Sequence, residues 1–244
     1  MSFYGDLSKF YKYIFPAKEP QLSFFKKHFR EHGVKKVLDV ACGTGEYTRE
    51  FAAWGMKSYG IDIQREMIEI ARERAKKEGL PAFFETADML NLPYHDEEFH
   101  GVICIGNSLV HLLQEEEILK SLQEMYRVLV GGGLIIIQTV NYDRVLKQNV
   151  RQLPTITNKT MGIEFKRYYH FRDDGNIDFC TVLSIENEGQ KSEHKNTVIL
   201  KPLLRSNLNS LLMEAGFKEM QYFGNFKEEQ WSENSFATVV KAIK

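Results

Sequence analysis

VLDVACGTGEYT, at residues 37–48, is an apolar run that leads into a turn containing two glycines. The run predicts a buried β-strand, and the residues after the turn predict a helix that begins near Glu46. Gly43 and Gly45 remove side chains where the backbone must pass close to another group, although glycine is also the ordinary residue of a tight turn. A strand, a glycine turn and a helix in this order are typical of α/β proteins that bind a ligand where the strand ends.

Apolar runs and helical patterns alternate along the chain on both sides of this stretch. A helix is predicted at residues 19–32, and two later patterns place apolar residues on one helical face, including Met67 with Ala71 and Ile118 with Leu122. This order predicts a mainly parallel, doubly wound sheet with helices on both faces. The predicted strands are residues 36–40, 57–61, 82–86, 101–105 and 134–139.

After Asn141 the pattern changes: Ile177, Phe179, Thr181, Leu183 and Ile185 alternate with mostly polar neighbours, and DDGN and NEGQ on either side predict turns. Residues of about 152–200 are therefore predicted to form an antiparallel β meander, inserted into a single domain of residues 1–244 before a last helix at about 205–215. The insertion follows the fifth strand, at the edge where open α/β sheets bind ligands. It is placed to be a lid, and the alternative is an extra layer that stabilises the edge.

The composition argues against several classes of function. Lys and Arg number 32 against 33 for Asp and Glu, so no overall basic field attracts nucleic acid. Cys42, Cys104 and Cys180 are odd in number and far apart, which favours reduced thiols over disulfides or a metal site. No segment resembles a signal peptide or a membrane span. We expect a soluble cytoplasmic protein with no metal and no nucleic-acid or membrane partner; the oligomeric state is not indicated.

The residues around the glycine turn indicate the kind of ligand. Thr48 stands where a dinucleotide-binding fingerprint has its third glycine, and the carboxylates of Asp39 and Glu46 bracket the loop. Carboxylates near a pyrophosphate would repel it, whereas they suit a ligand with a positive amino group and a positive sulfur. The turn therefore favours S-adenosylmethionine over a nicotinamide dinucleotide.

Two more acidic residues follow predicted strands. Asp62 ends YGID, where a carboxylate can accept hydrogen bonds from both ribose hydroxyls, and its alternative role is a helix cap. Asp88, in TADMLNLP, can accept from an adenine amino group while Ala87 and Met89 offer backbone and apolar contacts. The alternative role of Asp88 is a loop cap.

The motifs VLDVACGTG, GID, AD and LVGGG occur in order, and the first 140 or so residues resemble a class I S-adenosylmethionine-dependent methyltransferase. VICIGNSLVHL at 102–112, VNYDRVL at 140–146 and GNFKEEQWSENSF at 224–236 extend the resemblance to the glycine N-methyltransferase group of small-molecule enzymes. The resemblance implies a Rossmann-like seven-stranded sheet, S-adenosylmethionine as cofactor and a small-molecule methyl acceptor.

The resemblance also implies site residues. Tyr4 and Tyr13 would lie over the cofactor, with packed aromatics as the alternative, and His111 would lie near the cofactor, with a structural histidine as the alternative. Together with the residues discussed above, the expected cofactor-binding set is Tyr4, Tyr13, Asp39, Ala41, Gly43, Gly45, Asp62, Ile63, Ala87, Asp88, Met89, Ile105 and His111. The expected catalytic set is Asn107, which would face the acceptor, His111 and Tyr142.

One position departs from the glycine enzymes. Those enzymes hold the substrate carboxylate with an arginine immediately before the Asn-Tyr-Asp triplet, and this chain has Val140 there. A buried carboxylate without such a charge-assisted pair is poorly stabilised. We therefore expect a neutral or aromatic-bearing acceptor rather than glycine.

The expected reaction is direct in-line methyl transfer. A sulfonium methyl is already activated, so alignment and exclusion of water suffice, and alignment alone can lower a barrier by about 7–11 kcal/mol. An amine acceptor need only arrive neutral, whereas a hydroxyl acceptor needs a base, for which His111 and Tyr142 are candidates. N-methylation is thus slightly preferred over O-methylation. Three alternatives remain: an NAD-dependent oxidoreductase, a nucleic-acid methyltransferase suggested by KRYYHFR at 166–172, and a non-catalytic cofactor-binding protein.

Overall fold

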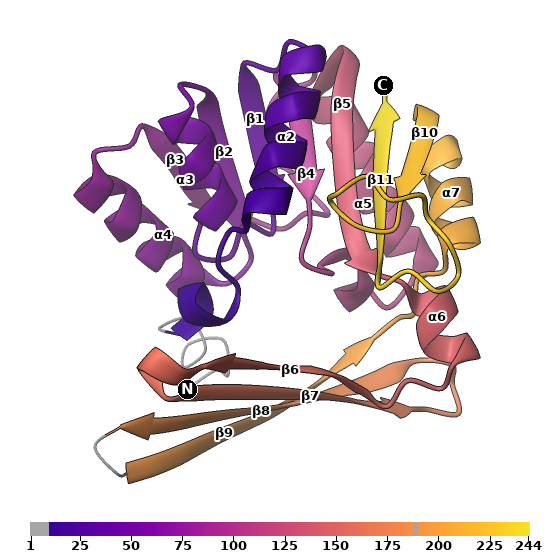
Figure 1. Ribbon diagram of the computed structural model, residues 1–244. Helices are drawn as coiled ribbons and strands as arrows, with labels where there is room; N and C mark the ends of the chain where they lie inside the picture. Colours follow the sequence, from indigo (N-terminus) through magenta and orange to yellow (C-terminus); the bar gives the residue numbers. More distant parts are fainter. Residues whose placement is uncertain (1–9, 188–189) are drawn as a thin grey trace.

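The computed structural model describes residues 10–187 and 190–244, which form two β-sheets and the helices around them (Figure 1). Within these residues the larger sheet has seven strands in the order β10-β11-β5-β4-β1-β2-β3. The pairings among β1 to β5 are parallel, and β11 lies antiparallel between β5 and β10. The predicted Rossmann-like, mainly parallel sheet is therefore confirmed.

The elements of the large sheet follow the predicted order. Its strands are β1 (Lys36–Val40), β2 (Lys57–Asp62), β3 (Ala82–Thr86), β4 (Phe99–Cys104), β5 (Leu129–Val140), β10 (Lys218–Phe223) and β11 (Ala237–Ile243). The helices are α2 (Glu19–Glu31), α3 (Glu46–Ala53), α4 (Arg65–Glu78), α5 (Glu115–Val128), α6 (Tyr142–Lys147) and α7 (Arg205–Glu214), with short 3-10 helices η1 (Leu109–His111) and η2 (Lys159–Met161).

Strand β5 begins five residues earlier than predicted, because it runs through three consecutive glycines. Leu129 already pairs with Phe99 of β4, and the register shifts before Leu134 pairs with Gly101. Gly132 has a positive φ of 75°, which marks an irregularity within the strand.

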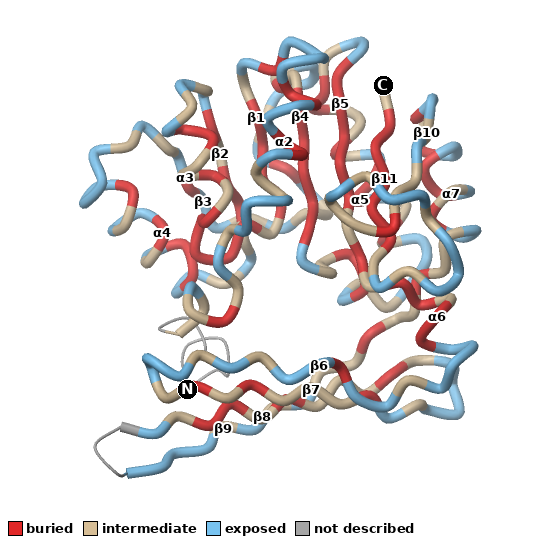
Figure 2. Tube along the Cα trace, viewed as in Figure 1, coloured by how far each residue is buried: buried red, intermediate tan, exposed pale blue. Residues whose placement is uncertain are grey.

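Alternate residues of the central strands face opposite helical layers. On β5, Ile135 and Ile137 join a core cluster with residues of α5 and α7, whereas Leu134 and Ile136 join a second cluster with α2 and α3. Figure 2 shows the central strands buried along most of their length. Burial on both faces explains why these strands are continuous apolar runs. Because β1 to β5 are parallel, their carboxyl ends lie at one edge of the sheet.

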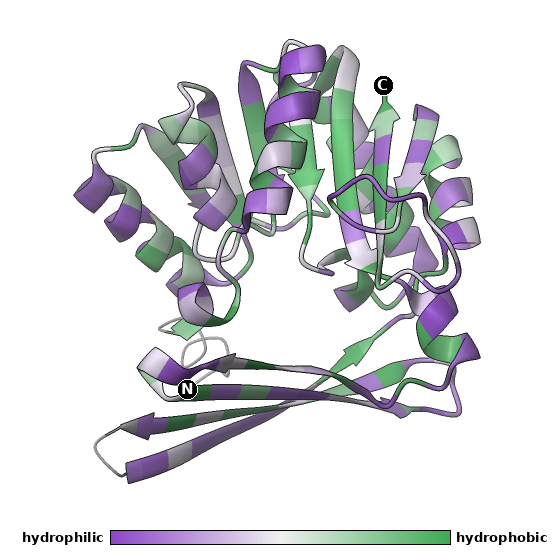
Figure 3. Cartoon of the chain, in the orientation of Figure 1, coloured by the Kyte–Doolittle hydropathy of each residue, from purple (hydrophilic) through white to green (hydrophobic). Residues whose placement is uncertain are grey.

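The inserted segment forms a second, antiparallel sheet, as predicted. Its strands in the described residues are, in sheet order, β6 (Gln152–Asn158), β7 (Ile163–Phe171), β8 (Ile177–Asn187) and β9 (Gln190–Leu200). Figure 1 shows this meander lying across the carboxyl edge of the large sheet, to which α6 connects it. Polar and apolar residues alternate along its strands (Figure 3).

Two apolar patches attach the meander to the rest of the chain. Beside α6, Tyr169 and Ile177 belong to the main core cluster. Towards the other end, Ile163, Phe165 and Leu183 cluster with Ile14 and the aromatic side chains of residues 10–15. The meander is therefore held at both ends over the edge of the large sheet.

No helix in the described part of the chain combines the length and apolar character that a bilayer crossing requires.

Candidate functional site

The glycine loop after β1 adopts an unusual backbone conformation. Ala41, Gly43 and Gly45 have φ values of 62°, 55° and 76°. A left-handed alanine costs roughly 1–2 kcal/mol, and such strain is typically retained at functional positions. A Cβ on Gly45 would come within 2.6 Å of the Phe84 ring, so only glycine fits there. Loops of this kind direct backbone N–H groups towards a shared concave side, where an anionic group can bind.

Asp62, at the end of β2, is linked to this loop. Its Oδ2 accepts a hydrogen bond from the Gly43 N–H at 2.9 Å, and its Oδ1 accepts from the Gln64 N–H at 2.9 Å. A carboxylate has about four lone-pair positions, so roughly two remain for a ligand. The next side chain, Ile63, is 62% exposed, which offers an apolar surface beside that carboxylate. Burial raises the pKa of Asp62, while the hydrogen bonds from Gln64 and Gly43 oppose this shift.

Asp39 and Glu46 do not present free charges to a ligand, so this part of the electrostatic prediction is wrong. Asp39 is 2% exposed and accepts a hydrogen bond from the Thr48 hydroxyl at 2.7 Å. Burial raises the pKa of Asp39 to about 7. Glu46 is buried and forms an ion pair with Arg74 of α4 at 2.6 Å. Both acids are therefore bonded to side chains of the neighbouring helices, Thr48 of α3 and Arg74 of α4.

The loop after β3 lies next to Asp62. The Ala87 N–H donates to the Asp62 carbonyl oxygen at 3.1 Å. Asp88 is exposed, and its Oδ1 accepts from the Leu90 N–H at 2.9 Å, so it serves as a loop cap. Met89 packs against the main core. Contacts of these residues with adenine stay a prediction.

The end of β4 carries a hydrogen-bonded network. Asn107 has φ 71°; its Nδ2 donates to the Tyr142 hydroxyl at 3.0 Å, and its Oδ1 accepts from the Val140 N–H at 2.9 Å. Tyr142 is fully buried and also hydrogen-bonds Tyr169 of β7. The side chain of Ile105, just before this turn, is buried in the cluster shared with α2 and α3.

This environment corrects the expectation that Tyr142 is a base. Burial raises the pKa of Tyr142 well above its ordinary value. The hydroxyl therefore stays protonated at neutral pH, and its partners are Asn107 and Tyr169 rather than an open surface. These hydrogen bonds link the turn after β4 to α6 and β7, and a contact of Asn107 with the acceptor stays a prediction.

His111 ends η1 and has a different environment. Its side chain is exposed, yet burial by the surrounding protein lowers its pKa. The imidazole is therefore neutral at pH 7 and can accept a proton.

The N-terminal arm contributes a residue that the sequence did not single out. The Tyr11 ring lies against the glycine loop, because a Cβ on Gly43 would come within 3.2 Å of it. Tyr13 packs instead with the patch around Ile14 and Phe165 of the meander, and Lys12 lies over its ring at 4.7 Å. Tyr4 lies outside the described residues.

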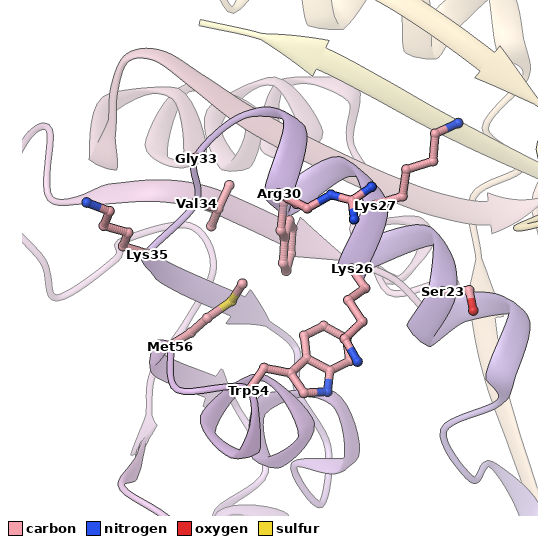
Figure 4. A pocket seen from close by; sticks show the side chains of 10 residues that line it. Ser23, Lys26, Lys27, Arg30, Gly33, Val34, Lys35, Trp54 and Met56 are labelled. Atoms are coloured by element: carbon pink, nitrogen blue, oxygen red, sulfur yellow. The ribbon is translucent and has the colours of Figure 1, made fainter.

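A separate hollow of about 560 Å³ lies at the opposite edge of the sheet, between α2 and the loops before β1 and β2 (Figure 4). Lys26 lies 5.4 Å from the centre of the Trp54 ring there. Gly33 and Met56, which help to line it, precede β1 and β2, so this hollow is distant from the carboxyl edge.

Comparison with known proteins gives consistent matches. The family described as a methyltransferase domain matches residues 37–133. The chain is 33% identical over 206 residues to a glycine/sarcosine N-methyltransferase of Aphanothece halophytica, covering 84% of this chain and 74% of that protein. It is 35% identical over 134 residues to the human glycine N-methyltransferase, covering 48% of this chain and 44% of that protein.

Solved structures show the same fold. An S-adenosylmethionine-dependent methyltransferase from Clostridium acetobutylicum superposes with a TM-score of 0.84 at 14% identity, covering 99% of both chains. An amino pentose methyltransferase from Micromonospora echinaspora, solved with S-adenosylmethionine bound, superposes with a TM-score of 0.71 at 16% identity, covering 93% of this chain and 92% of that one.

Proposed function

This chain belongs to the class I S-adenosylmethionine-dependent methyltransferases, in the group that contains the glycine/sarcosine N-methyltransferases, and we propose from that premise that it N-methylates a small-molecule amine between the carboxyl edge of its large sheet and the meander. The observation that supports this most strongly is the convergence of three features at that edge. They are the left-handed glycine loop, the Asp62 carboxylate with lone pairs to spare, and the exposed Ile63 beside it.

These features fit the chemistry of the cofactor. The N–H groups of the loop at residues 41–45 suit the carboxylate of a methionine moiety, and Asp62 suits two ribose hydroxyls. Ile63 and Met89 offer apolar contacts to adenine. Asp88 lies at the same end of the sheet, where its carboxylate can accept a hydrogen bond from the adenine amino group. When bound, S-adenosylmethionine supplies a methyl group already activated by a sulfonium.

The residues of this chain favour an amine acceptor over a hydroxyl acceptor. An amine that arrives neutral needs no base, whereas a hydroxyl must lose a proton. Tyr142 is enclosed and its pKa is raised, so it does not supply that base. His111 remains a candidate for this base. Burial lowers its pKa, and no carboxylate contributes to that shift by raising its basicity. The relatives named above act on amines, which agrees with this preference.

We also propose that the meander acts as a lid. Its two apolar patches hold it over the carboxyl edge, and the hydrogen bond between Tyr142 and Tyr169 joins it to the network of Asn107. A cover at this edge excludes water from the transferring methyl group.

The experiment that tests the function compares matched acceptors. The full-length protein is incubated with S-adenosylmethionine and a panel of small amines, each paired with its hydroxyl analogue, and formation of S-adenosylhomocysteine is measured. We expect turnover of amines to exceed that of the analogues, with none for single-stranded oligonucleotides. Turnover of oligonucleotides, or of hydroxyl compounds alone, would contradict the proposal.

A further inference from the structure

The hollow at the edge of the large sheet opposite the carboxyl ends, here called the α2 hollow, lies between two different walls. The segment between α3 and β2 forms one wall with Trp54 and Met56. Phe29 and Val34, which are 1% and 5% exposed, make its floor apolar. The other wall is a face of α2 that carries, at helical spacing, Ser23, Lys26, Lys27 and Arg30.

The side chains around the α2 hollow carry positive charge without matching negative charge. Lys35 joins Lys26, Lys27 and Arg30 there, and none of the lining residues in the described part of the chain is acidic. Lys27 is paired with Glu228 at 2.6 Å. Lys26, Arg30 and Lys35 form no ion pair within residues 10–187 and 190–244. The excess of positive charge suits an anion that carries more than one negative charge.

Two of the unpaired cations lie one helical turn apart. Lys26 and Arg30 are four residues apart on α2, so their Cβ atoms are about 5–6 Å from each other. A phosphate group between them can accept two parallel hydrogen bonds from the planar guanidinium and a further one from the ammonium. A phosphate ester carries about 1.5 to 2 negative charges, so it matches these cations better than a single carboxylate does.

Trp54 places an aromatic ring beside these donors. The Lys26 ammonium lies 5.4 Å from the centre of that ring, and Figure 4 shows the two side chains next to each other. Trp54 and Met56 are only partly buried. Nucleic-acid bases of every kind stack on tryptophan, and the methionine sulfur also contacts aromatic rings favourably. A ring stacked on Trp54 would carry an attached phosphate next to Lys26.

We propose that the α2 hollow binds a nucleoside phosphate, with the base against Trp54 and Met56 and the phosphate on Lys26 and Arg30. The volume of about 560 Å³ lies within the range of about 300–1,000 Å³ that is typical of small-molecule sites. The lining residues precede β1 and β2 or belong to α2, so the α2 hollow is separate from the proposed methyl-transfer site. The inference does not rest on the proposed function.

Isothermal titration calorimetry of the full-length protein with ADP and with GDP tests the inference. Saturating S-adenosylhomocysteine is present, which keeps the nucleotides out of the cofactor site. We expect a nucleotide Kd below about 1 mM, and weaker binding both of guanosine, which lacks phosphate, and of pyrophosphate, which lacks the ring. If neither nucleotide bound in this range, or if pyrophosphate bound as tightly as the nucleotides, the inference would be overturned.

Variants separate recognition of the phosphate from recognition of the ring. Lys26→Gln and Arg30→Gln should each raise the nucleotide Kd by about tenfold. Trp54→Leu should raise it by about 5- to 150-fold and leave the Kd of pyrophosphate unchanged. The matched control is Lys77→Gln, which removes an exposed cation of α4 that does not line the hollow. An equal loss in Lys77→Gln and Lys26→Gln, or no loss in Trp54→Leu, would count against the site.

Tryptophan fluorescence reports on the α2 hollow itself. The chain has two tryptophans, so Trp231→Phe leaves Trp54 as the sole emitter. A nucleotide stacked on Trp54 should quench this emission with the Kd that calorimetry gives for the same variant. Emission that stays constant while calorimetry detects binding would place the nucleotide elsewhere and overturn the inference.

Discussion

Replacing Asp62 by alanine removes the carboxylate that we assign to the cofactor ribose. Two of its roughly four lone-pair positions are occupied by the N–H groups of Gly43 and Gln64, which leaves about two for ribose hydroxyls. Stranding these partners costs about 1–3 kcal/mol, so the affinity for S-adenosylhomocysteine should fall by about 5- to 150-fold. Isothermal titration calorimetry of the two proteins measures this directly. Asp62→Asn, which keeps one acceptor oxygen, should give an intermediate loss.

The controls separate ligand binding from folding. Asp62→Ala also removes the acceptor for two backbone N–H groups, so its unfolding must be measured alongside binding. Asp96→Ala removes a carboxylate that is 74% exposed and paired with Arg127 on the side of the sheet where β4 begins, and it should bind as the wild type does. If folded Asp62→Ala bound S-adenosylhomocysteine with unchanged affinity, the assignment of Asp62 to the site would be refuted.

Three further predictions follow from the same geometry. Tyr142→Phe removes the hydroxyl that accepts from Asn107, so it should lower the free energy of unfolding by about 0.5–1.5 kcal/mol and reduce kcat. The pH dependence of kcat should not change. If the variant lost one limb of the pH–rate profile, Tyr142 would be a base after all. Because the pKa of Asp39 is raised from 3.8 to about 7, its protonated form favours the fold, and its contribution to stability is lost as pH rises through about 7. In urea unfolding, the free energy of unfolding of Asp39→Asn should therefore fall less between about pH 5 and about pH 8 than that of the wild type. An equal fall in both proteins would contradict this. Hydrogen exchange in β7 and β8 should slow when S-adenosylhomocysteine and an acceptor bind together. Exchange rates that are the same with and without the ligands would indicate that the meander is an extra structural layer and not a lid.

The sequence predicted the large sheet well because its strands are buried on both faces and are therefore continuous apolar runs. The glycine loop and Asp62 were also accessible, since their positions at strand ends follow from chain order. The roles of Asp39 and Glu46 were not, because they depend on Thr48 and on Arg74 of another helix. The order of elements along the chain does not determine which side chains of neighbouring helices contact these two acids.

The side of the meander on which Arg167 lies illustrates the same limit. Arg167 stands in a basic and aromatic stretch, and alternation alone does not tell which face of the strand meets the rest of the protein. The register with β8 and the apolar patches around Ile163 and Tyr169 decide it. Likewise, six residues of α6 are too few for a periodic pattern to reveal that Tyr142 is fully buried.

We propose that the carboxyl edge of the large sheet and the meander together hold the cofactor and an amine acceptor. A crystal structure of the full-length protein with S-adenosylhomocysteine and an acceptor tests it most directly. Ribose hydroxyls are expected on Asp62, the methionine carboxylate on the loop at residues 41–45, and the acceptor nitrogen facing the sulfur beneath β7. An acceptor bound outside the space between the sheet edge and the meander, or a cofactor that leaves Asp62 uncontacted, would contradict it.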